Sequence, residues 1–233
     1  MTPRIFPVVA VAATVTMLGC GVIGQVKQAA DNISAVGDLA QKLTDNEQAT
    51  FTAEYRLADG STTTVVQQPP NAAFIGPTGR FVVTPQALLM CGADKTCQKS
   101  SNGTGGLDVT NAGMIPTVAG TGFISAPLAL AMFSAASVAP GVKIDKNRKT
   151  IAGQHSTCLK VSNLKTDADP TPRGFAACVT DGGLLASFAG DTGKGQKASI
   201  EMTRYADSAD PQQFAAPAGY QVINVDHLQP PSA

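Results

Sequence analysis

Apolar and polar residues alternate with a period of two from Phe51 to Leu57. This alternation predicts a half-buried β-strand. Asp59-Gly60 follows as a hairpin signal, and the β-branched stretch 61–68 predicts a strand that pairs back. Similar runs, separated by turns that contain Gly and Pro, predict about four or five strands in the first half of the chain and about as many in the final third. Because the links between these strands are short, the predicted sheet is antiparallel.

Two stretches break this alternation and predict helices. From residue 25 to 43 the apolar residues recur in steps of three and four, which predicts a helix that lays one face on a core: Val26, Ala29, Ile33, Val36, Ala40 and Leu43. Ser125-Ala126-Pro127 predicts the start of a second helix and Pro140-Gly141 its end. The second helix is apolar nearly all round, which places it inside the protein. The simpler interpretation is a buried core helix, and the functional one is a helix that lines or covers an apolar cavity.

Together these elements predict an α+β fold. The strands form one wide, curved antiparallel sheet, and the N-terminal helix and the central apolar helix pack on its concave face. A sandwich of two sheets would leave the apolar helix without a place to be buried.

The N-terminus predicts export and a lipid anchor. Arg4 precedes an apolar run from Ile5 to Leu18, which is shorter than the roughly 20 residues that a bilayer core requires. A basic start, an apolar core and a small residue are typical of a secretory signal. Met17-Leu18-Gly19-Cys20 resembles the lipobox of bacterial lipoproteins, in which the cysteine receives a diacylglyceryl group and becomes the mature N-terminus. The resemblance implies a signal peptide over 1–19, a lipid on Cys20 and a place on the extracytoplasmic face of the cell membrane.

Four cysteines remain when Cys20 is set aside from the five in the chain. An even number in an exported protein indicates a disulfide framework, with three possible connectivities. The strand pattern favours Cys91–Cys97, which flank a predicted turn, and Cys158–Cys178. If Cys158 lies opposite Cys178 in a hairpin, the apolar neighbours in both strands share one face and the disulfide lies on the other. A zinc site is the alternative, but the C-x₂-C spacing that it needs is missing.

Composition and charge exclude several functions. The mature chain would carry 16 Lys and Arg (17 minus Arg4) against 17 Asp and Glu, so no basic footprint for nucleic acid is present. The two histidines, His155 and His227, belong to no recognisable catalytic motif. The Gly-rich stretch 100–106 lacks the lysine of a phosphate-binding loop. We therefore expect no enzyme activity, no catalytic residues, no metal and no cofactor.

Several phrases of the sequence resemble a family of lipoprotein carriers. An amphipathic N-terminal helix is followed by TFTAEYRLADG and TTTVVQQPPNAAF, later by IAGQHSTCLKV, and near the end by DPQQFAAPAGYQV. This order is similar to the LolA/LolB carriers and to the actinobacterial lipoproteins of the LppX and LprG type. The resemblance implies a lipidated tether over 20–24, a half-barrel domain over 25–224 and a flexible tail over 225–233. It also implies an apolar cavity between sheet and helices, for which the candidate lining residues are Phe123, Leu128, Met132, Phe133, Leu159, Val161 and Phe175.

Three functions follow as hypotheses. The first is a membrane-anchored envelope lipoprotein that binds a lipid or another hydrophobic ligand for transport or presentation. The second is an envelope sensor or scaffold that binds another protein, with the half-barrel filled by its own side chains. The third is a hydrolase with an unrecognised site. We expect a monomer that contacts the membrane through Cys20 and binds no nucleic acid, and the identity of a protein partner is left open.

Overall fold

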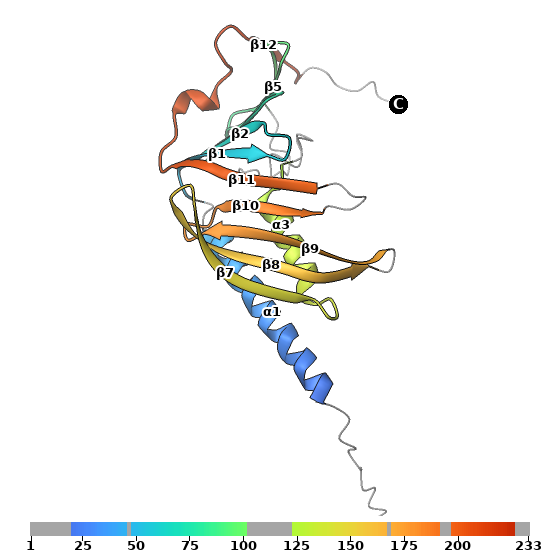
Figure 1. Ribbon diagram of the computed structural model, residues 1–233. Helices are drawn as coiled ribbons and strands as arrows, with labels where there is room; N and C mark the ends of the chain where they lie inside the picture. Colours follow the sequence, from blue (N-terminus) through green and yellow to red (C-terminus); the bar gives the residue numbers. More distant parts are fainter. Residues whose placement is uncertain (1–19, 46–47, 102–122, 167–168, 192–196, 227–233) are drawn as a thin grey trace, which may run out of the picture.

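The computed structural model describes residues 20–45, 48–101, 123–166, 169–191 and 197–226. Within these residues the chain forms a wide, curved, unclosed sheet of 12 strands, two α-helices and one short 3₁₀-helix (Figure 1). The prediction of an α+β fold built on one wide sheet is confirmed.

The strands of the first half of the chain, β1 to β6, and those of the second half, β7 to β11, form one sheet and meet where β1 pairs with β11. From one edge to the other the strand order runs β12-β6-β5-β4-β3-β2-β1-β11-β10-β9-β8-β7. The strands are β1 (Phe51–Leu57), β2 (Thr62–Gln68), β3 (Asn71–Gly76), β4 (Gly79–Val83), β5 (Leu88–Gly92), β6 (Thr96–Ser100), β7 (Lys143–Ile151), β8 (Gln154–Thr166), β9 (Asp169–Thr180), β10 (Leu185–Asp191), β11 (Lys197–Ala206) and β12 (Gln221–Asn224).

One strand departs from the predicted antiparallel pairing. β12 is parallel to β6, with Val222 opposite Cys97. A parallel pair requires a long connection, and residues 101–220 separate β6 from β12 in the sequence. The stretch 207–220, which follows β11, brings the chain back to β6. The prediction is wrong here because it assumes that every link between strands is short.

The N-terminal helix α1 (Cys20–Asp45) is longer than predicted, and residues 20–24, expected to be a tether, belong to it. Its buried side includes Asn32, which the apolar pattern does not select, whereas Ile33 is 52% exposed. The Asn32 Nδ2 donates to Val142 O at 3.1 Å, and its Oδ1 accepts from Ile144 N at 3.3 Å. These bonds offset the cost of burying an amide, and they fix α1 to the start of β7.

The second helix, α3 (Ala126–Ser137), begins where the sequence predicts. The Ser125 side chain accepts a hydrogen bond from Leu128 N at 3.3 Å, and proline lies in the first turn. The expectation that this helix is buried on all sides is wrong. Phe133 is fully buried, but Leu128 is 41% exposed, and Val138 at the C-cap is 69% exposed.

Both predicted disulfides are present, Cys91–Cys97 between β5 and β6 and Cys158–Cys178 between β8 and β9. In each pair the two cysteines are direct cross-strand partners. The register beside the second disulfide is the predicted one, because Leu159 lies opposite Ala177. The period of two therefore predicts the register of this hairpin correctly, and both cysteines belong to the larger buried cluster, with Leu159 and Ala177.

The sheet has a core on each face. The larger core lies on the face that carries α1 and α3, called the helix face below, and its side chains come from both helices and most strands. A smaller core on the reverse face joins Val66, Ala73, Val82, Leu89 and the Cys91–Cys97 disulfide.

The C-terminal strap, residues 207–220, covers this smaller core. Phe214 and Tyr220 of the strap pack against it, and the strap contains the 3₁₀-helix η2 (Pro211–Phe214). Arg80 of β4 holds the strap in place, since its guanidinium donates to Ala215 O at 3.1 Å and to Gln213 Oε1 at 3.3 Å.

Candidate functional site

Most residues expected to line a cavity are packed in the larger core. Phe133, Leu159 and Val161 have no exposed surface, and Phe175 and Phe123 are nearly as buried. Aromatic rings touch in this core: the centroids of Phe133 and Phe175 are 4.8 Å apart, and Phe175 stacks on Phe188 at 6.1 Å. These side chains fill the space between α3 and the sheet.

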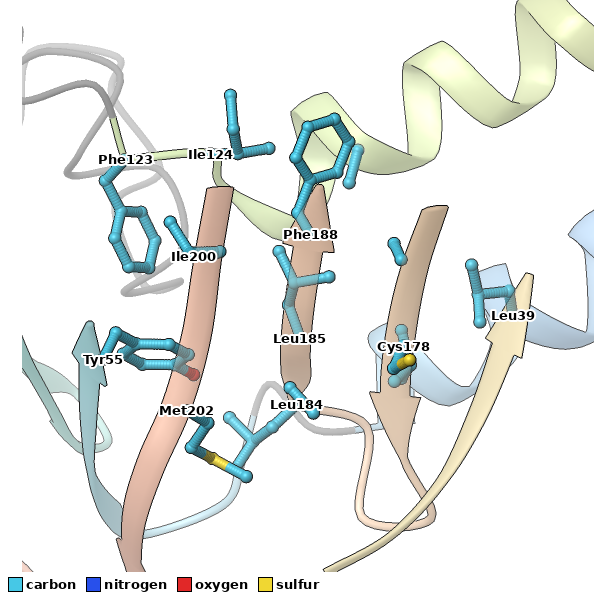
Figure 2. Close-up of a cluster of buried hydrophobic side chains, with 14 of the residues drawn as sticks. Leu39, Tyr55, Phe123, Ile124, Cys178, Leu184, Leu185, Phe188, Ile200 and Met202 are labelled. Carbon is cyan, nitrogen blue, oxygen red and sulfur yellow. The ribbon is translucent and has the colours of Figure 1, made fainter. Parts of the chain in front are cut away.

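Phe123, Met132 and Leu128 differ from Phe133, Leu159, Val161 and Phe175 in their contacts or exposure. Phe123 contacts Tyr55 at 5.2 Å and Phe74 at 5.5 Å, each ring edge to face. Figure 2 shows Phe123 and Ile124 above Tyr55 and Ile200, with α3 beyond them. Met132 is half-buried against the core, and Leu128 faces outward. The structure thus brings together Phe133, Leu159, Val161 and Phe175 without joining all seven candidates at one site.

A different part of the helix face carries a hollow. On β3, β4 and β5 three glycines are consecutive cross-strand partners, with Gly76 opposite Gly79 and Gly79 opposite Gly92. A row of glycines leaves the sheet without side chains at this level. The backbone is close-packed there, because a Cβ on Gly79 would lie 2.2 Å from Cys91 O.

The next row along the same strands is apolar. Phe74 lies opposite Phe81, Phe81 opposite Met90, and Met90 opposite Gln98. The two phenylalanines are buried, but Met90 is 47% exposed. Phe74, Phe81 and Met90, called the apolar row below, form a wall beside the glycines, and Gln98 follows them on β6.

The two rows border a pocket of about 310 Å³. Its rim is polar, and its wall and floor come from the apolar row and the glycines. It is lined by Phe74, Thr78, Gly79, Arg80, Phe81, Met90, Cys91, Gly92, Asp94, Thr96 and Gln98. Its volume is at the lower end of the range of about 300–1,000 Å³ for small-molecule pockets. The pocket has room for one apolar chain or ring system, with the polar rim available to hold a head group.

A buried hydroxyl lies close to the glycine row. Thr63 of β2 has no exposed surface, and its Oγ1 has no hydrogen-bond partner in the described structure. It is 3.9 Å from the point where a Cβ on Gly76 would be. Its strand partner Tyr55 is buried too, and this burial raises the pKa of the Tyr55 phenol, which therefore stays neutral. The β2 side of the hollow is thus uncharged.

Charged side chains gather near the opposite edge of the sheet, around α1 and the edge strand β7. Lys146 pairs with Asp38 at 2.8 Å, and Lys42 pairs with Asp181. The hydrogen bond and charge of each lysine lower the pKa of the carboxyl that it contacts. A second hollow, of about 560 Å³, is lined by residues of α1, β7 and β8. Its two lysines are compensated by Asp38 and Asp181, and Arg148 also lines it.

The sequence does not reveal the pocket of the glycine row. Gly76, Gly79 and Gly92 occur in short stretches that are typical of turns. The signal for the pocket is their cross-strand alignment, which appears only when the register of three strands is known.

Cys20 is the first residue of α1, and its lipid remains a prediction. Among the described helices, none combines the length and apolar character needed to cross a membrane. In the described residues, His, Cys, Asp and Glu side chains form no group of three that could hold a metal ion.

Comparisons with known proteins identify a distant structural likeness. No protein-family model and no curated protein matches the chain. The crystal structure of an uncharacterized conserved protein from Thermus thermophilus resembles it with a TM-score of 0.45 and 8% sequence identity, over 81% of this chain and 98% of that one.

Proposed function

We propose that this chain is a cell-envelope lipoprotein that binds an apolar ligand for transport or presentation. In this proposal Cys20 carries the lipid, residues 1–19 are removed, and the domain lies on the extracytoplasmic face of the cell membrane. The curved sheet acts as a half-barrel with α1 and α3 on its concave face. No catalytic step, metal or cofactor is part of the proposal, and the domain acts as a monomer.

The observation that carries the proposal is the pocket beside the glycine row. A wall of Phe74, Phe81 and Met90 offers apolar contact, and the half-exposed Met90 side chain is flexible enough to adapt to a ligand. Apolar pockets with a few polar groups at the rim are typical of small-molecule sites. The site differs from the one expected from the sequence, which lies under α3.

A second function is favoured by the packing under α3. Phe133, Leu159 and Val161 leave no exposed surface there, which fits a half-barrel filled by its own side chains. In that case the protein is an envelope sensor or scaffold that binds another protein. The two functions differ in what occupies the pocket of the glycine row.

A binding titration separates them. The mature chain, residues 20–233, with Cys20→Ala is titrated with a fluorescent fatty acid, alone and with a second substitution, Met90→Glu. A carboxylate in the wall is expected to reduce the affinity by at least about tenfold, because the acyl chain would desolvate it. The matched control is Lys99→Glu, an exposed change on the neighbouring strand whose side chain points to the reverse face. Equal affinity in Met90→Glu and Lys99→Glu would exclude this pocket, and no binding by the parent protein would favour the scaffold.

A further inference from the structure

Hydrogen bonds hold α1 to the start of β7, the edge strand of the sheet. Gln28 Nε2 and Asn32 Nδ2 both donate to Val142 O, at 3.2 and 3.1 Å. N-terminal to this crossing, α1 continues beyond the sheet as far as Cys20 (Figure 1). This extension of eight residues (28 − 20) is about 12 Å long. The end of the molecule at the β7 edge is therefore the end at which α1 starts.

Two large apolar side chains are exposed at this end. Val138 at the C-cap of α3 is 69% exposed, and Ile33 of α1 is 52% exposed. Both belong to the end of the molecule where Val142 leads into β7, since Val138 precedes Val142 by four residues and Ile33 follows the Asn32 that binds Val142. Exposed apolar side chains at the end of the molecule where α1 starts are available to contact a membrane.

The β7 edge beside them is rich in cations. Its nine residues include Lys143, Lys146, Arg148 and Lys149 and a single acidic residue, Asp145. All five side chains are exposed. Lys143 pairs with Asp145 within the strand, and Lys146 pairs with Asp38 of α1. In the described structure neither Arg148 nor Lys149 forms an ion pair, so the edge has a net positive charge.

We propose that this end of the molecule docks on a lipid bilayer that contains anionic lipid. The docking surface, called the anchor-side surface below, consists of Ile33, Val138 and the four β7 cations. Apolar side chains flanked by Lys and Arg are the combination that binds at the interface of an anionic membrane. Tilting of α1 towards the bilayer brings the edge strand to the headgroups, where Arg148 and Lys149, the two cations without an ion pair in the described structure, each strengthen binding about fivefold.

This orientation has a consequence for the pocket. β7 is one edge of the sheet, whereas β4 and β5, which carry the pocket, lie near the other edge. Docking through β7 therefore leaves the pocket directed away from the bilayer. The inference takes from the proposed function only the lipid on Cys20, which would hold α1 at the membrane. The experiment below replaces that lipid with an artificial tether.

The test uses a probe at the anchor-side surface. The mature chain, residues 20–233, with Cys20→Ser is held on nickel-chelating vesicles by an N-terminal histidine tag, so no acylation is needed. A polarity-sensitive dye is attached at Val138→Cys and, in a separate protein, at Ser208→Cys. Ser208 is an exposed residue of the C-terminal strap. Vesicles of phosphatidylcholine alone and with phosphatidylglycerol are compared.

We expect a blue shift of the dye at Val138→Cys on anionic vesicles, no shift at Ser208→Cys, and loss of the shift in high salt. Arg148→Gln and Lys149→Gln should each lower the docked fraction relative to the undocked one about fivefold, whereas Lys99→Gln near the far edge should leave it unchanged.

Equal responses at both dye positions, or no response at Val138→Cys, would overturn the inference. A shift that depends on protein density and not on lipid charge would overturn it in favour of contact between two copies. A failed lipid titration with normal docking would remove the proposed ligand and leave the docking surface.

Discussion

Under α3 the helix face of the sheet is filled by aromatic rings, whereas on β3, β4 and β5 the same face carries a row of glycines. Phe133, Phe175 and Phe188 close the first region by direct contact. In the second region Gly79 and Gly92 line an open pocket beside Phe81 and its neighbours. The difference teaches that a wide sheet need not use its whole surface as a core. In the proposed account the first region supplies stability and the second supplies a ligand site, and the following experiments test that division.

The largest effect is expected for Phe133→Ala. The side chain has no exposed surface and contacts Phe175, so its removal leaves a cavity in the larger core. We expect the free energy of unfolding to fall by about 3–5 kcal/mol, measured by denaturant titration. Leu128→Ala, on the exposed side of the same helix, is the control and should cost less than about 1 kcal/mol. If the free energy of unfolding fell by similar amounts in the two variants, the side of α3 that faces the sheet would not be closely packed.

The two disulfides offer a second comparison, because each belongs to one group of strands. Cys158 and Cys178 are separated by 20 residues, and Cys91 and Cys97 by 6. In the chain-entropy account, removing the first costs about 3.3 kcal/mol and removing the second about 2.3 kcal/mol. Paired Cys→Ala variants and thermal unfolding would measure this difference. A larger loss for Cys91–Cys97 would show that this disulfide supports the small core beneath the C-terminal strap beyond its entropic effect.

The glycine row can be tested by adding one methyl group. In Gly79→Ala the Cβ would lie 2.2 Å from Cys91 O, so the backbone must shift. We expect a loss of about 1–3 kcal/mol in denaturant unfolding. Gly37→Ala is the matched control, since its Cβ would meet nothing within 4 Å, and alanine should stabilise α1 by about 0.5–1 kcal/mol. If Gly79→Ala were as stable as the parent, the strands around the pocket would be less closely packed than the structure shows.

The smallest effect concerns pH. Lys146 lowers the pKa of Asp38, and Lys42 lowers that of Asp181, and both pairs tie α1 to the sheet. A carboxyl whose pKa is lowered in the folded state stabilises fully above the unfolded value of about 4, and the contribution disappears as pH falls through the folded value. The protection factors of the α1 amides in hydrogen exchange, corrected for the intrinsic exchange rate at each pH, should therefore fall on acidification through this window.

Asp38→Asn and Asp181→Asn together should flatten that dependence, and Asp207→Asn, an exposed aspartate after β11, should not. Unchanged pH dependence in the double variant would show that the two pairs contribute nothing measurable to the attachment of α1, which is common for exposed ion pairs.

Parts of the fold could be predicted because their signals are local. The register around Cys158 and Cys178 follows from a period of two and one cross-strand constraint, and the structure confirms it. The start of α3 at Ser125 follows from a capping hydroxyl and a proline. Neither inference needs knowledge of distant segments.

Other parts depend on contacts between segments far apart in sequence. Asn32 is buried because Val142 and Ile144 provide its hydrogen bonds, 110 and 112 residues away. The parallel pairing of β12 depends on the course of the C-terminal strap, which Arg80 fixes from another strand. The pocket depends on the alignment of glycines in three strands. The pattern of apolar and polar residues predicts none of these three features. It therefore leads to an expected site under α3, where apolar residues are most frequent.

The most direct test of the central claim is native mass spectrometry of the soluble form, with Cys20 replaced and the protein purified from its own host. The account predicts an added mass that organic extraction removes, and its absence from a Met90→Glu variant prepared in the same way. A clean unliganded mass for the parent protein, with no uptake of added lipids, would contradict a ligand site beside the glycine row.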